Sequence, residues 1–238
     1  MTLTAALLDP ILKSNPARPL ITFYDDATGE RIELSGLTTA NWAAKTANML
    51  RDECDVETGT PVAVLLPAHW QTAAVLLGAW WCGAHVVAEP ADAEWILCDS
   101  DRLDLALAAA PSGGVVALSL DAFGKGLTGL PDGVIDYATE VRTHGDEFVP
   151  WEPVPDTAPA LGDLSVAAAT AAALRRAGEL DITATDRVLS MADWATLDGV
   201  VDGLLSVLAI GSSLVQCRNP DMGKMIARAA AEKCTRRL

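Results

Sequence analysis

The chain has 238 residues, of which 50% are hydrophobic; this size and composition fit a globular α/β protein with a sizeable core and exclude a disordered one. Its formal net charge of −15 at pH 7 repels polyanions, which argues against nucleic acid and anionic lipid headgroups as partners.

Apolar periodicity and turn-forming residues predict strands that alternate with helices along the whole chain. The predicted helices cover residues 5–13, about 39–50 (capped by Thr38 or Thr39), 70–82, 103–109, 134–142, 164–177, 196–210 and 222–234. The predicted strands cover residues 20–24, 31–34, 61–66, 85–87, 95–98, 115–118, 187–190 and 213–216, the first two joined in a hairpin. This alternation predicts a single α/β domain over residues 1–238, with a mixed, mainly parallel sheet and helices on both faces.

Residues 60–88 contain no Asp, Glu, Lys or Arg, and such a stretch is long enough to span a bilayer. Pro67 and His69 interrupt it and Gly83 ends its helical part, so a buried strand–helix–strand unit of a parallel sheet is the better interpretation. We therefore expect a soluble protein with no membrane segment, and the lack of a basic region before the first apolar residues predicts no signal peptide.

The cysteines form no C-x-x-C pair and lie in apolar context, which predicts buried free thiols in a reducing, cytoplasmic compartment. They are Cys54, Cys82, Cys98, Cys217 and Cys234. The basic residues between Arg218 and Arg237 run against the overall acidic charge, and we interpret them as the solvated side of an amphipathic helix.

Two blocks of the sequence carry a family pattern. The first runs from Leu37 to Ala84 and comprises a helix, the turn Glu57-Thr58-Gly59, an apolar strand and a helix that ends at Cys82-Gly83-Ala84. The second joins the strand at 185–190 to the apolar segment at 204–215. Together they resemble the N-terminal domain of the adenylate-forming superfamily, which includes acyl-CoA synthetases, peptide synthetase adenylation domains and luciferases. The resemblance implies that fold and is weak evidence for activity.

The chain departs from this family at the segment that corresponds to the family's phosphate-binding loop. A phosphate-binding loop needs glycines, so that backbone N–H groups converge on the anion, and usually a lysine. Residues 163–177 stand in the place of that loop and contain neither. The resemblance also implies that the adenine-binding motif, the ribose-binding Asp and the C-terminal domain with its catalytic Lys have no counterpart within these 238 residues.

These departures predict a non-catalytic homologue of adenylate-forming enzymes, without a cofactor, that acts as a binding or interaction module. The alternative is an acid–thiol ligase component that works only when a partner chain supplies the missing catalytic half. The alanine- and leucine-rich sequence from Ala160 onward gives little polar cover, so we also expect an apolar surface buried in a symmetric homodimer.

Ala192-Asp193-Trp194-Ala195 stands where the resemblance places an aromatic residue at the acyl pocket. Trp194 either lines a surviving cleft for an acyl or other small-molecule ligand, with Asp193 beside it, or is a core tryptophan, since an indole serves both uses. We predict no catalytic residue, because none of the histidines has a recognisable nucleophile arranged around it.

Two weaker motifs have ordinary explanations. Gly124 to Gly129 spells G-x-G-x-x-G, but Leu130-Pro131-Asp132-Gly133 follows it and prevents the helix that a dinucleotide site needs, so we interpret it as a loop. Asp198 and Asp202 are spaced to share a cation, but an acidic stripe near a helix N-terminus explains them equally well, so we predict no metal site.

Overall fold

The computed structural model describes residues 1–238 and contains two β-sheets in place of the one that we expected. The five-stranded sheet consists of β1 (Pro19–Asp25), β2 (Glu30–Ser35), β10 (Arg187–Ser190), β11 (Ser213–Arg218) and β12 (Arg236–Arg237). Its strand order is β12-β10-β11-β1-β2, and only the β1–β2 hairpin is antiparallel. The N-terminal hairpin therefore joins a sheet whose other strands come from the last quarter of the chain.

The seven-stranded sheet is formed by the middle of the chain. Its strands are β3 (Pro61–Leu65), β4 (His85–Val87), β5 (Trp95–Asp99), β6 (Gly114–Leu118), β7 (Ile135–Asp136), β8 (Pro159–Leu161) and β9 (Leu164–Ser165). The order is β7-β6-β5-β3-β4-β8-β9, with all pairs parallel except the β8–β9 hairpin. The predicted class, α/β with mainly parallel strands flanked by helices, is confirmed.

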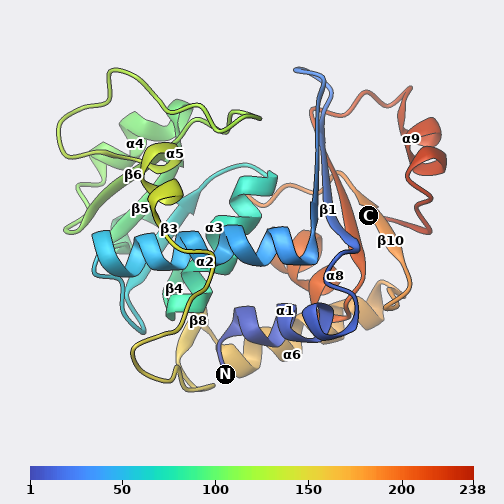
Figure 1. The fold of residues 1–238 in the computed structure, drawn as a ribbon, viewed down its shortest axis with the longest axis horizontal. Helices are drawn as coiled ribbons and strands as arrows, with labels where there is room; N and C mark the ends of the chain where they lie inside the picture. Colours follow the sequence, from blue (N-terminus) through green and yellow to red (C-terminus); the bar gives the residue numbers. More distant parts are fainter.

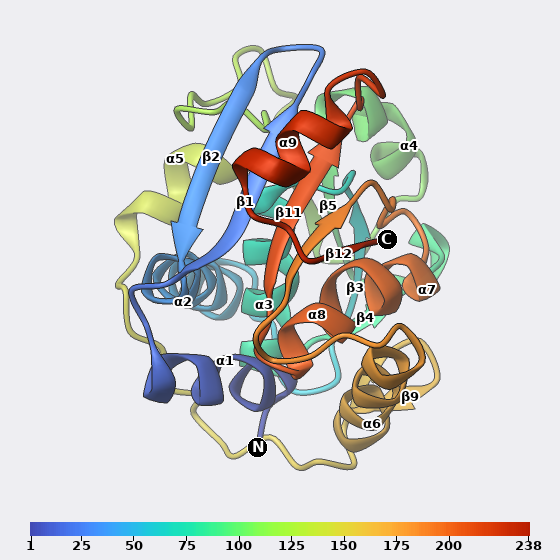
Figure 2. The ribbon, with the colours of Figure 1, turned by 90° about the vertical axis from the view of Figure 1, so that its right-hand side faces the viewer.

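The helices fill the space between the sheets and cover their outer faces. They are α1 (Leu3–Ser14), α2 (Gly36–Glu53), α3 (Trp70–Cys82), α4 (Leu103–Ala108), α5 (Tyr137–Glu140), α6 (Val166–Glu179), α7 (Leu197–Val200), α8 (Ser206–Ala209) and α9 (Met225–Ala231). Figures 1 and 2 show α2 and α3 between the two sheets, α1 and α6 below them, and α9 on the outer face of the five-stranded sheet. No helix has both the length and the apolar character that a bilayer crossing requires.

Helix α3 is apolar on nearly all sides because it lies in the centre of the molecule, where all but one of its residues are buried. The Nδ1 atom of His69 accepts the backbone N–H of Gln71 and begins the helix, and Gly83 ends it with a left-handed φ of 91°. Both ends agree with the sequence prediction. Helix α2 begins slightly earlier than predicted, because its cap is Ser35 and not Thr38 or Thr39.

Three predicted helices differ in the structure. Residues 134–142 form β7, α5 and the start of a 3-10 turn, because Ile135 pairs with Val116 at the sheet edge. Residues 164 and 165 pair as β9 before α6 begins. The helix predicted at 196–210 is divided into α7 and α8 by a π-helical turn over Val201–Leu205.

The basic C-terminal segment is only in part the solvated face that we expected: Lys224, Lys233, Arg236 and Arg237 are exposed, but Arg228 is held against the hairpin. Arg228 on α9 donates to both carboxylate oxygens of Asp26, at 3.0 and 2.7 Å, and its guanidinium lies 4.1 Å from the centre of the Tyr24 ring. Glu232 accepts hydrogen bonds from Tyr24, Arg31 and Arg187. Oppositely charged groups on the N-terminal hairpin thus hold this segment against the five-stranded sheet.

Candidate functional site

A small apolar cavity of about 180 Å³ lies where strands of both sheets end. One wall comes from the carboxyl ends of β3 and β4 and from α3, and the other from the segment after β10 and from α7. The crevice outside the carboxyl ends of parallel strands is the usual place for ligands in α/β proteins. The lining residues, 10 of them hydrophobic, are Val64, Leu65, Thr72, Leu76, Val86, Val87, Ala88, Glu89, Trp194, Ala195, Thr196, Leu197 and Val200.

Trp194 satisfies both interpretations of its sequence context, since it is only 3% exposed and also forms part of the cavity wall. Its indole packs on Gly203 in the π-helical turn, where a Cβ atom would lie 2.5 Å from the indole Nε1. The Nε1 atom has no hydrogen-bond partner. Any side chain at position 203 would therefore push the indole, so Gly203 sets the position of this wall.

Asp193 supports the cavity from outside and is not one of its lining residues. This exposed side chain accepts hydrogen bonds through Oδ1 from the backbone N–H groups of Trp194, at 2.6 Å, and Ala195, at 3.2 Å. These bonds fix the turn that presents Trp194. Ligand contact by Trp194 and Asp193 stays a prediction.

A two-residue turn leads into the segment 163–177, which the sequence places where the family has its phosphate loop. Gly162 and Asp163 join β8 directly to β9, and α6 begins at Val166. The Gly162 N–H donates to the carbonyl of Val86 at 2.9 Å, and the Gly162 carbonyl lies 2.7 Å from His85 Nε2. A Cβ atom at Gly162 would lie 2.7 Å from Cδ1 of Leu197, so the turn is packed tightly beside the cavity.

The residues that line the cavity include no Lys or Arg. The lining residues fall within two stretches, 52–101 and 188–217, that contain neither Lys nor Arg. Glu89 is the charged side chain among the lining residues, and it is exposed at the end of β4. An anion that enters the cavity would therefore meet apolar walls and a carboxylate.

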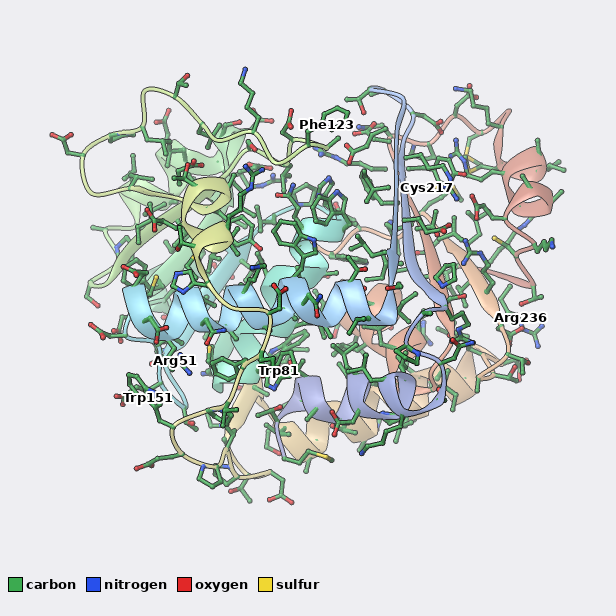
Figure 3. All side chains as sticks on the ribbon, viewed as in Figure 1. Arg51, Trp81, Phe123, Trp151, Cys217 and Arg236 are labelled. Atoms are coloured by element: carbon green, nitrogen blue, oxygen red, sulfur yellow. The ribbon has the colours of Figure 1, made fainter.

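The weaker motifs bring no set of metal ligands together and begin no helix at the glycines. Asp202 accepts hydrogen bonds from Arg176 at 2.8 and 3.1 Å, Asp198 is exposed, and no three His, Cys, Asp or Glu side chains are placed to share a metal ion. The glycine-rich motif at 124–129 lies in the long loop between β6 and β7, as we had interpreted it. This loop carries Phe123 toward the β1–β2 hairpin, and the two border an open groove (Figure 3).

A second cavity, of about 310 Å³, was not foreseen from the sequence. It lies near the C-terminal end of α2, where Arg51 stands between the rings of Phe148, at 5.0 Å, and Trp151, at 5.3 Å (Figure 3). Arg51 donates to Asp52 and to the carbonyl of Val149, so its guanidinium is already engaged. The cluster holds the proline-rich segment that contains Phe148 and Trp151 against α2. The one indication of this cavity in the sequence is Trp151, which stands among prolines; in the structure its side chain is 70% exposed.

Known proteins resemble this chain in sequence and in fold. No protein-family model matches it. A "TIGR03089 family protein" of Mycobacterium tuberculosis (strain ATCC 25618 / H37Rv) is 53% identical over 239 residues, which cover 99% of this chain and 97% of that protein.

Two solved structures share the fold over 100% of this chain. They are an acyl-CoA synthetase of Brucella canis, with a TM-score of 0.80 at 17% identity, and the anthranilate CoA ligase AuaEII in complex with anthranoyl-AMP, with a TM-score of 0.76 at 14% identity. The chain spans about half the length of each, 47% and 49%. This likeness confirms the predicted fold of the N-terminal domain of adenylate-forming enzymes.

Proposed function

The chain belongs to the TIGR03089 family, and we propose that it is a non-catalytic relative of acyl-CoA synthetases that binds a small apolar molecule. The observation that supports this most directly is the pairing of an apolar cavity with a tight turn at Gly162 and Asp163, directly before a segment without glycine or lysine. The cavity has room for a small acyl group, whereas the turn has no cationic side chain to bind the phosphates of a nucleotide and its Gly162 N–H already donates to the carbonyl of Val86.

The residues present do not fit a nucleoside triphosphate. Adenylation develops charge on the phosphoryl oxygens and on the leaving pyrophosphate, and preorganised N–H donors, cationic side chains and Mg²⁺ must meet that charge. The Gly162 N–H donates to the carbonyl of Val86, and the residues that line the cavity include no Lys, Arg or His. Since the loss of one such donor typically costs about 3 kcal/mol of transition-state stabilisation, the loss of the whole set removes the reaction.

The cavity fits a small ligand by volume and by polarity. An apolar cavity of about 150 Å³ holds a benzene molecule, and this cavity measures about 180 Å³. Its walls are rigid, because Leu76, Val86 and Trp194 are each at most 3% exposed. A ligand bound here gains from the burial of apolar surface without any chemical step.

Two measurements test the proposal. Carboxylate-dependent ATP–pyrophosphate exchange by the purified chain should stay at background, and clear exchange would overturn the non-catalytic assignment. Thermal-shift screening with acyl-CoAs, fatty acids, their neutral analogues and nucleotides should show a rise in Tm for an apolar compound and none for nucleotides. The rise should disappear in Trp194→Ala. If no compound raises the Tm of the wild-type protein, the binding function is wrong.

A second candidate is a ligase component that needs a partner chain, which the match to about half of each solved neighbour favours. The same exchange assay separates the two functions. A partner-dependent enzyme gives no exchange alone and clear exchange after addition of the partner, and the exchange must fall when the cavity is altered by Trp194→Ala. A binding module gives no exchange, with or without the partner.

We also propose that the protein self-associates as a homodimer. The support is the exposure of apolar side chains on the last third of the chain, where Leu174 on α6 is 46% exposed and Ile226 on α9 is 73% exposed. Light scattering behind a sizing column at tens of micromolar should give twice the mass of one chain, and a monomeric mass would refute the homodimer.

A further inference from the structure

We infer that the cavity at Trp194 selects a neutral ligand with one ring or about six carbon atoms, and that it rejects the corresponding carboxylate. This inference rests on the proposed binding function and defines its ligand. It separates the protein chemically from an enzyme that must admit a free carboxylate as substrate. Three properties of the cavity carry it: fixed volume, lack of positive charge, and one free hydroxyl donor.

The volume sets the size limit. At about 180 Å³ the cavity exceeds the benzene-binding example by only a few atoms, so a fused two-ring system or a long alkyl chain would have to extend out of its mouth or move a wall. Trp194 cannot retreat, because its indole already rests on the Cα atom of Gly203. Leu197, in the same wall as Trp194, is held by the Gly162 turn.

The charge sets the preference for a neutral group. A carboxylate moved out of water needs an ion pair or several hydrogen bonds to replace its hydration. The lining residues supply no Lys, Arg or His, and Glu89 at the mouth adds a like charge. We therefore expect a carboxylate to bind at least about 10-fold more weakly than a neutral compound of the same shape.

Of the two hydroxyls in the lining, one is free to donate a hydrogen bond to a neutral acceptor. The hydroxyl of Thr72 is already used, because it donates to the carbonyl of Pro67 at 2.7 Å. The hydroxyl oxygen of Thr196 accepts the N–H of Gly199 at 3.0 Å, which leaves its own proton free to donate. An amide, ketone or ester carbonyl suits this donor and carries no charge to desolvate.

Matched ligands test the inference. Benzamide and benzoate have the same shape and differ in charge at pH 7, and 2-naphthamide adds a second ring to benzamide. Titration calorimetry of each with the wild-type protein should give benzamide an affinity at least about 10-fold higher than benzoate, and 2-naphthamide should bind more weakly than benzamide. Glu89→Gln should narrow the gap between benzamide and benzoate, whereas Glu152→Gln, which removes an exposed carboxylate that does not line this cavity, should leave it unchanged.

The outcomes separate this inference from the proposed function. Equal or tighter binding of benzoate overturns the charge selection and leaves a binding module. Binding of 2-naphthamide as tight as that of benzamide overturns the size limit. If none of the three binds while a long-chain acyl compound raises the Tm, the ligand class is wrong. If nothing binds at all, both the inference and the proposed function fail.

Discussion

Replacement of Glu232 by Gln should release the C-terminal segment from the N-terminal hairpin. The Glu232 carboxylate is 9% exposed and accepts hydrogen bonds from Tyr24 Oη at 2.5 Å, Arg31 at 3.0 Å and Arg187 at 2.5 Å. These partners belong to β1, β2 and β10, so one carboxylate ties the end of α9 to strands on both sides of β11. A glutamine keeps the shape and loses the charge that all three donors face.

The magnitude follows from the pKa of the carboxyl. Burial by itself would raise this pKa, but the hydrogen bonds from Tyr24, Arg187 and Arg31 outweigh burial and lower it from 4.5 to about 2. Since one pKa unit corresponds to 1.36 kcal/mol, the ionised carboxylate stabilises the fold by about 3 kcal/mol at most. Arg31 is 45% exposed and its charge is screened by water, so we expect Glu232→Gln to cost about 2 kcal/mol.

The pH dependence gives the sharper test. A carboxyl whose pKa is lowered by folding contributes its full stability above its unfolded pKa, and that contribution is lost as the pH falls through the folded pKa. Urea unfolding followed by tryptophan fluorescence should therefore show the full loss in Glu232→Gln at pH 7 and a much smaller loss near pH 2.5. Glu152→Gln, which removes an exposed and unpaired carboxylate, is the matched control and should change little. A loss below about 0.5 kcal/mol at pH 7, or one that does not shrink in acid, would refute the reasoning.

The remaining predictions concern the cavity wall and the thiols. Gly203→Ala should lower the free energy of unfolding by about 1–2 kcal/mol and weaken ligand binding, because the new Cβ would lie 2.5 Å from Trp194 Nε1. The control in the same urea titration is Gly178→Ala, whose Cβ would have nothing within 4 Å, and this variant should be neutral or stabilising. Burial raises the pKa of Cys54 and Cys82 to about 12 and of Cys98 to about 11, so a thiol reagent at pH 8 should modify at most the half-buried Cys234 in the native protein and all the cysteines in denaturant. Rapid modification of a second thiol in the native state would contradict the described core.

The sequence was sufficient where local signals decide the structure. His69 and Gly83 mark the two ends of α3, and the apolar runs at β3, β4 and β10 were predicted within a residue, because caps, glycines and continuous hydrophobicity act over a few neighbouring residues. The lack of glycine and lysine over residues 163–177 can also be read from the sequence, and the absence of a phosphate-binding loop stays a prediction. These local features were enough to predict the α/β class and to expect that no phosphate-binding loop is present.

Tertiary structure alone decided how the elements combine. Ile21 on β1 pairs with Leu214 on β11, and this pairing divides the strands between two sheets, whereas hydrophobic periodicity reports that a residue is buried and not which partner buries it. For the same reason the sequence could not predict that Gly203 packs against Trp194 or that Glu232 accepts a hydrogen bond from Tyr24 on the hairpin. The cavity is a property of walls brought together from distant segments, so its volume and its lack of cations become visible only after the chain has folded.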